Sequence, residues 1–140
     1  MPLSDELVSG AASRCQTALI VIGRTAGEDR DNAAEKGSWY LTDGEEAMLE
    51  IVCRHFSRTV VILNVGNIID MSFVDRYEPS SVLYIWQGGM EGGSGAVDVI
   101  TGKVPASGRS VIRLLIILMI IHLPGILAVR IPFAMKKISM

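Results

Sequence analysis

Three short runs of apolar residues mark the chain before its C-terminal part. They are TALIVIG at 17–23, TVVILNV at 59–65 and SVLYIW at 81–86, and each is continuous rather than alternating with polar residues. A continuous apolar run of this length, closed by glycine or turn residues, is typical of a strand buried on both faces of a parallel sheet. The pattern therefore predicts three parallel strands, each covered on both faces.

Segments with helical spacing lie before and between these runs. The clearest is 41–56, where Thr42 and Glu45 have the spacing of a capping box and apolar residues recur at helical intervals. Shorter helices are predicted at 5–14, at 67–77, and at 96–102 with Gly102 at its end. The alternation of strands and helices predicts an α/β fold, a three-layer sandwich whose mainly parallel sheet is incomplete.

In such sheets, functional groups gather in the loops at the carboxyl ends of the strands. Here these loops are 24–40, 66–70 and 87–95. The first is the most polar, with Glu28 and Asp31 following Arg24 just past a strand. A carboxylate there could serve as a general acid or base if its surroundings adjust its pKa, whereas spacing alone equally fits a solvated loop of balanced charge.

Glycines and aromatic residues near the other loops leave their roles open. The run QGGMEGGSG at 87–95 could let a ligand approach the backbone, but its spacing is not that of a phosphate-binding loop and fits the entry to a helix. Trp39, Tyr40 and Trp86 could stack on sugar rings or close an edge of the core.

Several ordered motifs resemble one enzyme family. VIGRTAGEDRDN, LNVGNIIDM, WQGGMEGG and AVDVITGKVPASGR closely resemble the C-terminal α/β sandwich domain of glycoside hydrolase family 3, the β-glucosidase and β-xylosidase family, over about residues 6–109. The resemblance implies that a barrel domain carries a nucleophilic aspartate and that the sandwich domain lends an acid/base glutamate from a GE motif. Glu28 matches this glutamate, and Arg24 and Asp31 would be substrate-binding residues of the same loop.

The resemblance covers the sandwich domain of the family and does not extend to its barrel domain. Retaining glycosidases need two carboxyl groups about 5–5.5 Å apart, and one of them lies in the barrel. We therefore expect a fragment that contributes the acid/base half of a β-glycosidase site and is inactive alone. Its partners would be the β-glycoside substrate of the parent enzyme and the missing N-terminal barrel, in trans if that is separately encoded. The alternative is a non-catalytic module, membrane-anchored or carbohydrate-associated.

Charge divides the chain into two parts. All 15 Asp and Glu lie at or before Asp98, whereas the residues after Ser110 carry charge only as Arg113, Arg130, Lys136 and Lys137. A single fold rarely segregates charge in this way. We therefore treat 1–109 as the partial glycosidase domain and 110–140 as a hydrophobic tail.

Three hypotheses describe the tail. A transmembrane helix within 111–129 is one, although the apolar run is shorter than the roughly 20 residues that span a bilayer. A buried helix of the sandwich is the second. The third is a frameshift, because a one-base shift lets 110–124 be reread as LSDTIAYNIDDYPST, similar to the family's continuation. We favour the frameshift.

Composition also bears on nucleic-acid binding, on metal or cofactor sites, on the cysteines and on the location of the protein. A net charge of −2 gives no reason to expect nucleic acid, and the isolated His55 and His122 indicate neither a metal site nor a cofactor. Cys15 and Cys53 lack motif spacing and are predicted to be buried thiols. The start of the chain does not resemble a signal peptide, so we expect a cytoplasmic location, with membrane attachment through the tail as the alternative.

Overall fold

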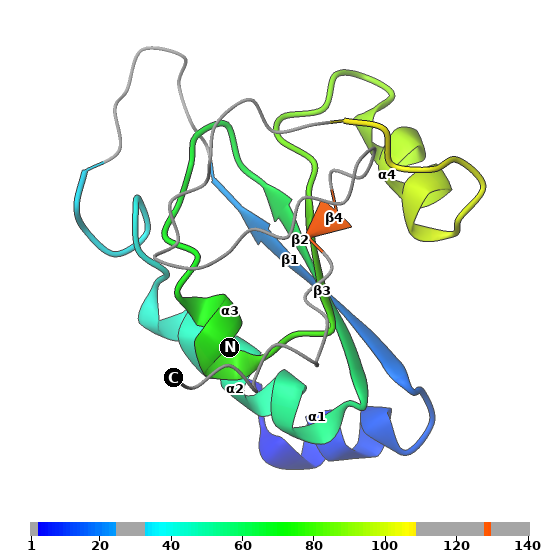
Figure 1. The fold of residues 1–140 in the computed structure, drawn as a ribbon. Helices are drawn as coiled ribbons and strands as arrows, with labels where there is room; N and C mark the ends of the chain where they lie inside the picture. The colour runs from blue at the N-terminus through cyan, green and yellow to red at the C-terminus, as the bar shows by residue number, and fades with distance from the viewer. Residues whose placement is uncertain (1–2, 25–32, 109–127, 130–140) are drawn as a thin grey trace, which may run out of the picture.

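The computed structural model describes residues 3–24, 33–108 and 128–129 of the chain. Its elements are α1 (Asp5–Ala12), β1 (Thr17–Gly23), α2 (Asp43–His55), β2 (Arg58–Asn64), α3 (Phe73–Tyr77), β3 (Ser81–Tyr84), α4 (Gly92–Ile100) and β4 (Ala128–Val129). The α/β prediction is confirmed, since strands and helices alternate around a sheet with helices on its flanks (Figure 1).

The sheet has the strand order β1-β2-β3-β4. The first three strands are parallel, as predicted, and β1 and β2 pair along their whole length from Thr17↔Arg58 to Gly23↔Asn64. β4 adds to β3 in the antiparallel sense, with Leu83 opposite Ala128. The parallel part therefore brings the carboxyl ends of β1, β2 and β3, at which the three predicted loops start, to one edge of the sheet, at the top of Figure 1.

Helices α1, α2 and α3 lie together on one face of the sheet and form the main core with it. Each crossover joins a strand to its immediate neighbour, and right-handed connections of that kind place successive helices on the same side. Leu49 of α2 and Val61 and Leu63 of β2 are fully buried in this layer. One helical layer thus supplies most of the core.

The opposite face of β1 departs from the prediction that every strand is covered on both faces. Ile20 and Ile22 are buried, whereas Leu19 and Val21, which alternate with them along the strand, are 53% and 59% exposed. Side chains alternate across a strand, and the described helices cover this edge strand on one side. A continuous apolar sequence cannot reveal that asymmetry.

Helix α2 begins as its sequence predicts. The Thr42 hydroxyl accepts a hydrogen bond from the backbone N–H of Glu45 at 3.2 Å, and the Glu45 carboxylate accepts one from the backbone N–H of Thr42 at 2.8 Å. This reciprocal pair satisfies two donors that a helix start otherwise leaves open. The prediction from spacing alone is confirmed at atomic detail.

The other helices differ from their predicted bounds. The predicted helix 67–77 is reduced to α3, because Ile69 and Met71 are buried in an irregular segment before it. Helix α4 begins at Gly92, inside the glycine-rich run, and not at residue 96 as expected. Gly102 follows its end with φ of +76°, the left-handed conformation expected of a glycine after a helix.

The structure also bears on the predictions for the two cysteines and for the tail. Cys15 is exposed, because it lies in the turn after α1, so the prediction of a buried thiol is wrong there; Cys53 is half-buried. The described piece of the tail is β4 and not a helix. Among the helices in the described ranges, none has the length and apolar character needed to cross a bilayer.

Candidate functional site at the carboxyl ends of the strands

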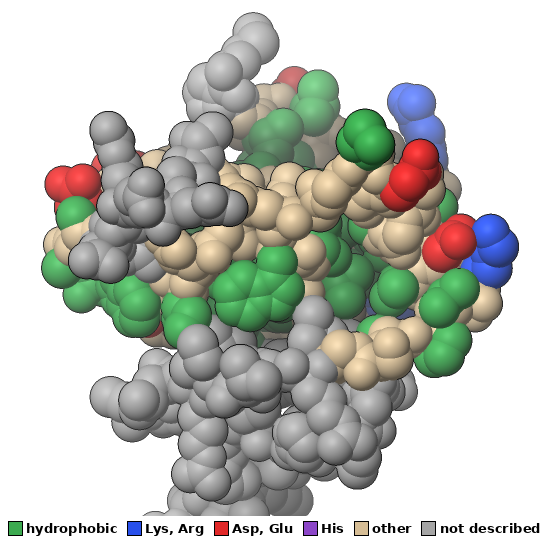
Figure 2. Space-filling model, turned by 90° about the horizontal axis from the view of Figure 1, so that it is seen from above, with side chains coloured by type: hydrophobic (Ala, Val, Ile, Leu, Met, Phe, Trp, Pro, Cys, Tyr) green, Lys and Arg blue, Asp and Glu red, His purple; other side chains and the backbone are tan. Residues whose placement is uncertain are grey.

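Backbone hydrogen bonds join the first predicted loop to the end of β2 and to the second predicted loop. The N–H of Arg24 donates to the carbonyl of Asn64 at 3.1 Å, and the N–H of Asp70 donates to the carbonyl of Trp39 at 2.8 Å. Viewed from this end, charged side chains lie toward the two sides, and hydrophobic side chains and backbone occupy the middle (Figure 2). The fold therefore brings the described parts of the first two predicted loops into contact.

Arg24 is the predicted site residue that the structure describes, and its guanidinium binds Glu45. One nitrogen contacts Oε1 in an ion pair, and the other donates to Oε2 at 2.8 Å. The guanidinium also donates to the carbonyl of Gly23 at 3.0 Å. The two side chains are only 12% and 18% exposed, so this is a largely buried bidentate pair.

Glu45 binds Arg24 and also caps the start of α2. Burial alone would raise the pKa of its carboxyl, but the hydrogen bonds from Arg24 and Thr42 outweigh burial and hold that pKa below its ordinary value. The charged carboxylate thus joins the start of α2 to the end of β1. The sequence analysis identified Glu45 only as a capping residue, because no spacing rule pairs residues 21 positions apart.

Glu28 and Asp31 lie in 25–32, outside the described residues. The positions on either side of this segment are placed. Arg24 is bound to Glu45, and the N–H of Ala33 donates to the hydroxyl of Ser38 at 3.0 Å. The carbonyl of Ala33 accepts a hydrogen bond from the N–H of Trp39 at 3.2 Å. Both flanks of the segment are therefore attached to the folded body.

A polar cavity of 360 Å³ opens beside these flanks. Residues from the first loop, from α2, from the second loop and from α3 line it, among them Lys36, Glu46, Asp70 and Arg76. Arg76 donates to Glu46 at 2.6 Å, and Lys36 forms ion pairs with Glu46 and with Asp43. Opposite charges thus compensate one another around a space that polar groups of a ligand could enter.

The third loop starts with an unusual backbone conformation at Trp86. Its φ is +56°, which a residue with a bulky side chain adopts rarely, and such strain is concentrated at functional sites. The Trp86 ring lies against Tyr84 with centroids 4.4 Å apart, and Tyr84 donates its hydroxyl hydrogen to the carbonyl of Asn67 at 2.6 Å. Trp86 thus closes the core edge, while Tyr40 at the first loop is 44% exposed.

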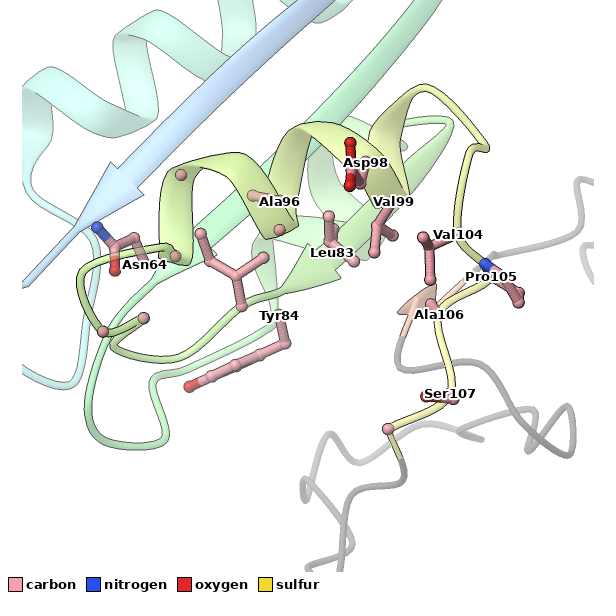
Figure 3. Close-up of a pocket in the computed structure, with 17 residues that line it drawn as sticks. Asn64, Leu83, Tyr84, Ala96, Asp98, Val99, Val104, Pro105, Ala106 and Ser107 are labelled. Atoms are coloured by element: carbon pink, nitrogen blue, oxygen red, sulfur yellow. The ribbon is translucent and has the colours of Figure 1, made fainter.

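Beyond Trp86, the glycine-rich run and α4 enclose a second cavity of 560 Å³ (Figure 3). Leu83 points toward Val99 of α4 across it, and Val104 to Gly108 border its other side. Its walls are largely apolar or glycine backbone. Within the described ranges, no group of three His, Cys, Asp or Glu side chains is placed to hold a metal ion.

Comparison with protein families identifies the chain's relationship. Residues 4–114 match the model of the glycosyl hydrolase family 3 C-terminal domain. A β-glucosidase of Ruminococcus albus is 53% identical over 109 residues, which cover 78% of this chain and 12% of that enzyme. β-Glucosidase A of Butyrivibrio fibrisolvens is 34% identical over 130 residues, which cover 76% of this chain and 16% of that enzyme. The chain thus spans a small part of the curated relatives that it matches.

Solved structures give the same result. A β-glucosidase from Paenibacillus barengoltzii superposes with a TM-score of 0.70 at 45% identity, over 74% of this chain and 12% of that chain. β-Glucosidase 3B from Thermotoga neapolitana, solved in complex with glucose, superposes with a TM-score of 0.68 at 32% identity, over 72% and 14%. The chain therefore belongs to glycosyl hydrolase family 3, and its matched residues correspond to the C-terminal domain of that family.

Proposed function

We propose that this chain supplies the acid/base half of a β-glucosidase site, with Glu28 as the residue that protonates the leaving group. The observation that carries the proposal is the family match across the segment VIGRTAGEDRDN, which starts in β1 and contains Glu28. Two features of the described residues support it. Arg24 fixes the start of the segment through Glu45, and Ala33 attaches its end through Ser38.

We further propose that the 140 residues by themselves do not hydrolyse glycosides. A retaining glycosidase needs a nucleophilic carboxylate about 5–5.5 Å from the acid/base carboxyl. Near the described part of the site, Glu45 and Glu46 are bound to arginines, and Asp70 accepts a hydrogen bond from the backbone N–H of Ser72 at 3.3 Å. The nucleophile would come from the barrel part of a β-glucosidase, covalently linked or supplied in trans.

A chimera tests the role of Glu28. Residues 1–108 would replace the matched segment of the Ruminococcus albus β-glucosidase, and hydrolysis of aryl β-glucosides would be measured for the chimera and for the 140-residue chain. We expect turnover by the chimera and none by the chain alone. Turnover by the chain that is abolished by Glu28→Gln would contradict the need for a partner.

Leaving groups separate an acid/base role from a structural one. In the chimera, Glu28→Gln should slow an alkyl β-glucoside far more than a dinitrophenyl β-glucoside, because the good leaving group departs without protonation. The matched control is Glu35→Gln, which changes an exposed carboxylate of the same loop. Equal losses on both substrates would argue against Glu28 as the acid.

Asp31 remains a proposed substrate-binding residue, whereas for Arg24 we propose a positioning role in place of substrate binding. Its guanidinium is bound to Glu45, so it would act by fixing the loop and not by binding sugar. In the chimera, Arg24→Ala should then lower kcat, with a change in the pH profile of kcat. Asp31→Asn should instead raise KM if Asp31 binds a sugar hydroxyl.

We also propose that residues 110–140 arise from a shifted reading frame. The support is the abrupt loss of acidic residues after Asp98 together with the family-like sequence that a one-base shift restores. Sequencing the DNA around the codon for Arg109 tests this. A shifted frame that encodes no family-like sequence would refute it.

A further inference from the structure

The cavity of 360 Å³ between the first loop, α2, the second loop and α3 is lined by residues from the described part of the chain. Leu41 and Phe73 are 5% and 2% exposed, so the cavity extends down to the hydrophobic core. Tyr40 also lines it and is 44% exposed. The other lining residues are polar or charged, and they are Lys36, Glu46, Asp70, Ser72 and Arg76. The cavity therefore offers apolar, aromatic and hydrogen-bonding groups in one space, and ligand pockets start at about 300 Å³.

The charged side chains that line the cavity compensate one another. Glu46 accepts a hydrogen bond from Arg76 at 2.6 Å and lies 3.7 Å from the Nζ of Lys36. The Asp70 carboxylate accepts hydrogen bonds from the N–H and the hydroxyl of Ser72. Two cations thus face two anions. A charged ligand would have to separate one of these pairs, whereas a neutral polar ligand can add hydrogen bonds to them.

The ion pairs leave hydrogen-bonding capacity for a ligand. A guanidinium and an ammonium carry more N–H groups than these pairs use, and the side chains of Arg76 and Lys36 are each 56% exposed. Glu46 is 29% exposed and accepts hydrogen bonds through both carboxylate oxygens. A hydroxyl group donates and accepts, so neighbouring hydroxyls of one ligand can bind a cation and a carboxylate together. The exposed ring of Tyr40 adds a surface for the apolar C–H face of such a ligand.

We propose that this cavity binds a neutral sugar ring. The C–H face of the ring packs against Tyr40, and two neighbouring hydroxyls bind Arg76 and Glu46. The proposal goes beyond the hydrolytic role proposed above and does not rest on Glu28, because none of the lining residues belongs to 25–32.

Nuclear magnetic resonance of the ¹⁵N-labelled 140-residue chain tests the proposal, with methyl β-D-glucopyranoside as the probe. We expect saturable shifts of the amide signals of residues that line the cavity, with a dissociation constant of about 1 mM or weaker for so small a ligand. Glu28→Gln should leave the binding unchanged, which separates this site from the proposed acid/base role. The absence of saturable shifts, or shifts confined to residues outside the cavity, overturns the proposal.

Two substitutions of Tyr40 test the contact with the ring. Tyr40→Ala should weaken binding of the glucoside by roughly tenfold, because the aromatic surface is lost. Tyr40→Phe keeps the ring and should bind as the parent chain does. The dispersion of the amide signals shows that each variant remains folded. Equal binding by the alanine variant and the parent chain overturns the proposal, and so does equal binding of open-chain sorbitol and the glucoside by the parent chain.

The charge balance gives an independent test with inorganic phosphate as a second probe. The parent chain should bind phosphate more weakly than the glucoside. Glu46→Gln removes the anion between Arg76 and Lys36, so it should weaken glucoside binding and strengthen phosphate binding at the same residues. The matched control is Glu50→Gln, which changes an exposed carboxylate of the same helix and should alter neither affinity. Tighter binding of phosphate than of the glucoside by the parent chain would identify an anion site and overturn the proposal.

Discussion

Arg24 and Glu45 show how a single side-chain pair connects the end of a strand to the start of a helix. The pair is bidentate and largely buried, and its carboxylate also caps α2. Removing one partner leaves the other charge in a region with little water, which costs more than the pair itself contributes. Loss of either side chain is therefore expected to destabilise the fold.

Arg24→Ala is therefore expected to lower the free energy of unfolding by about 2 kcal/mol at neutral pH. The matched control is Lys103→Ala, which removes an exposed partner of Asp98 and should cost less than about 0.5 kcal/mol. Urea unfolding followed by circular dichroism measures both. Equal costs would contradict a special role for the buried pair.

The pH dependence of stability should report on Glu45. Its pKa is held below the ordinary value of 4.5, so the stability that it contributes is complete above about pH 4.5 and is lost as the pH falls through the lowered folded-state pKa. Glu45→Gln should remove this acid limb. An acid limb of the same size in the variant would assign it to other carboxylates.

Tyr84 gives a separate prediction at high pH. Burial raises its pKa to about 12 from the ordinary value of 10, partly opposed by a backbone hydrogen bond. Unfolding lets the hydroxyl ionise at lower pH, so stability should fall between pH 10 and 12, by up to about 3 kcal/mol. Tyr84→Phe should flatten this limb, and phenolate absorbance during titration would follow the ionisation directly.

Helix α4 and the loop before it depend on close backbone contact. A Cβ added at Gly88 would lie 2.6 Å from the Cα of Gly92, a distance that forces one backbone segment to move, whereas one added at Gly89 meets open space. Neither position was identified as constrained from the sequence, because both belong to one glycine-rich run. The tertiary approach of the loop to α4 distinguishes them.

Gly88→Ala should destabilise the chain by roughly 1–3 kcal/mol, in the range of overpacking, and should increase hydrogen exchange in α4. Gly89→Ala is the matched control and should change neither measurement. If both variants behave alike, the contact between Gly88 and Gly92 does not constrain the loop.

The strands and α2 were predictable because their signals are local. Each predicted strand begins within one residue of the observed one, and the capping box of α2 needs only Thr42 and Glu45 at the right spacing. Helix α3 was overpredicted because Ile69 and Met71 are apolar at helical spacing, yet they are buried in an irregular segment. Periodicity cannot tell these two uses of apolar residues apart.

The molecule as a whole depends on a one-sided core, which makes it sensitive to loss of buried volume. Leu49 of α2 is fully buried between the helical layer and the sheet. Leu49→Ala should cost about 2–5 kcal/mol, a large part of the 5–15 kcal/mol typical of a folded domain. Leu7→Ala, on the exposed side of α1, should cost far less, and thermal unfolding of both variants measures the difference.

Parallel pairing explains which parts of the candidate site were predictable. That the three loops start at one edge of the sheet followed from the sequence, because parallel strands end at the same edge. The binding of Arg24 to Glu45 was not predictable, because it depends on where α2 crosses the sheet.

By itself, the sequence determined where the strands lie, how α2 starts, that the order is α/β, and the family that its motifs resemble. These properties depend on residue type and on short spacings along the chain. Only the tertiary structure decided that α1, α2 and α3 share one face, that Leu19 and Val21 remain open, and that Glu45 binds Arg24. The physical reason is that strand order and crossover direction determine which faces and side chains meet, and neither is set by local pattern.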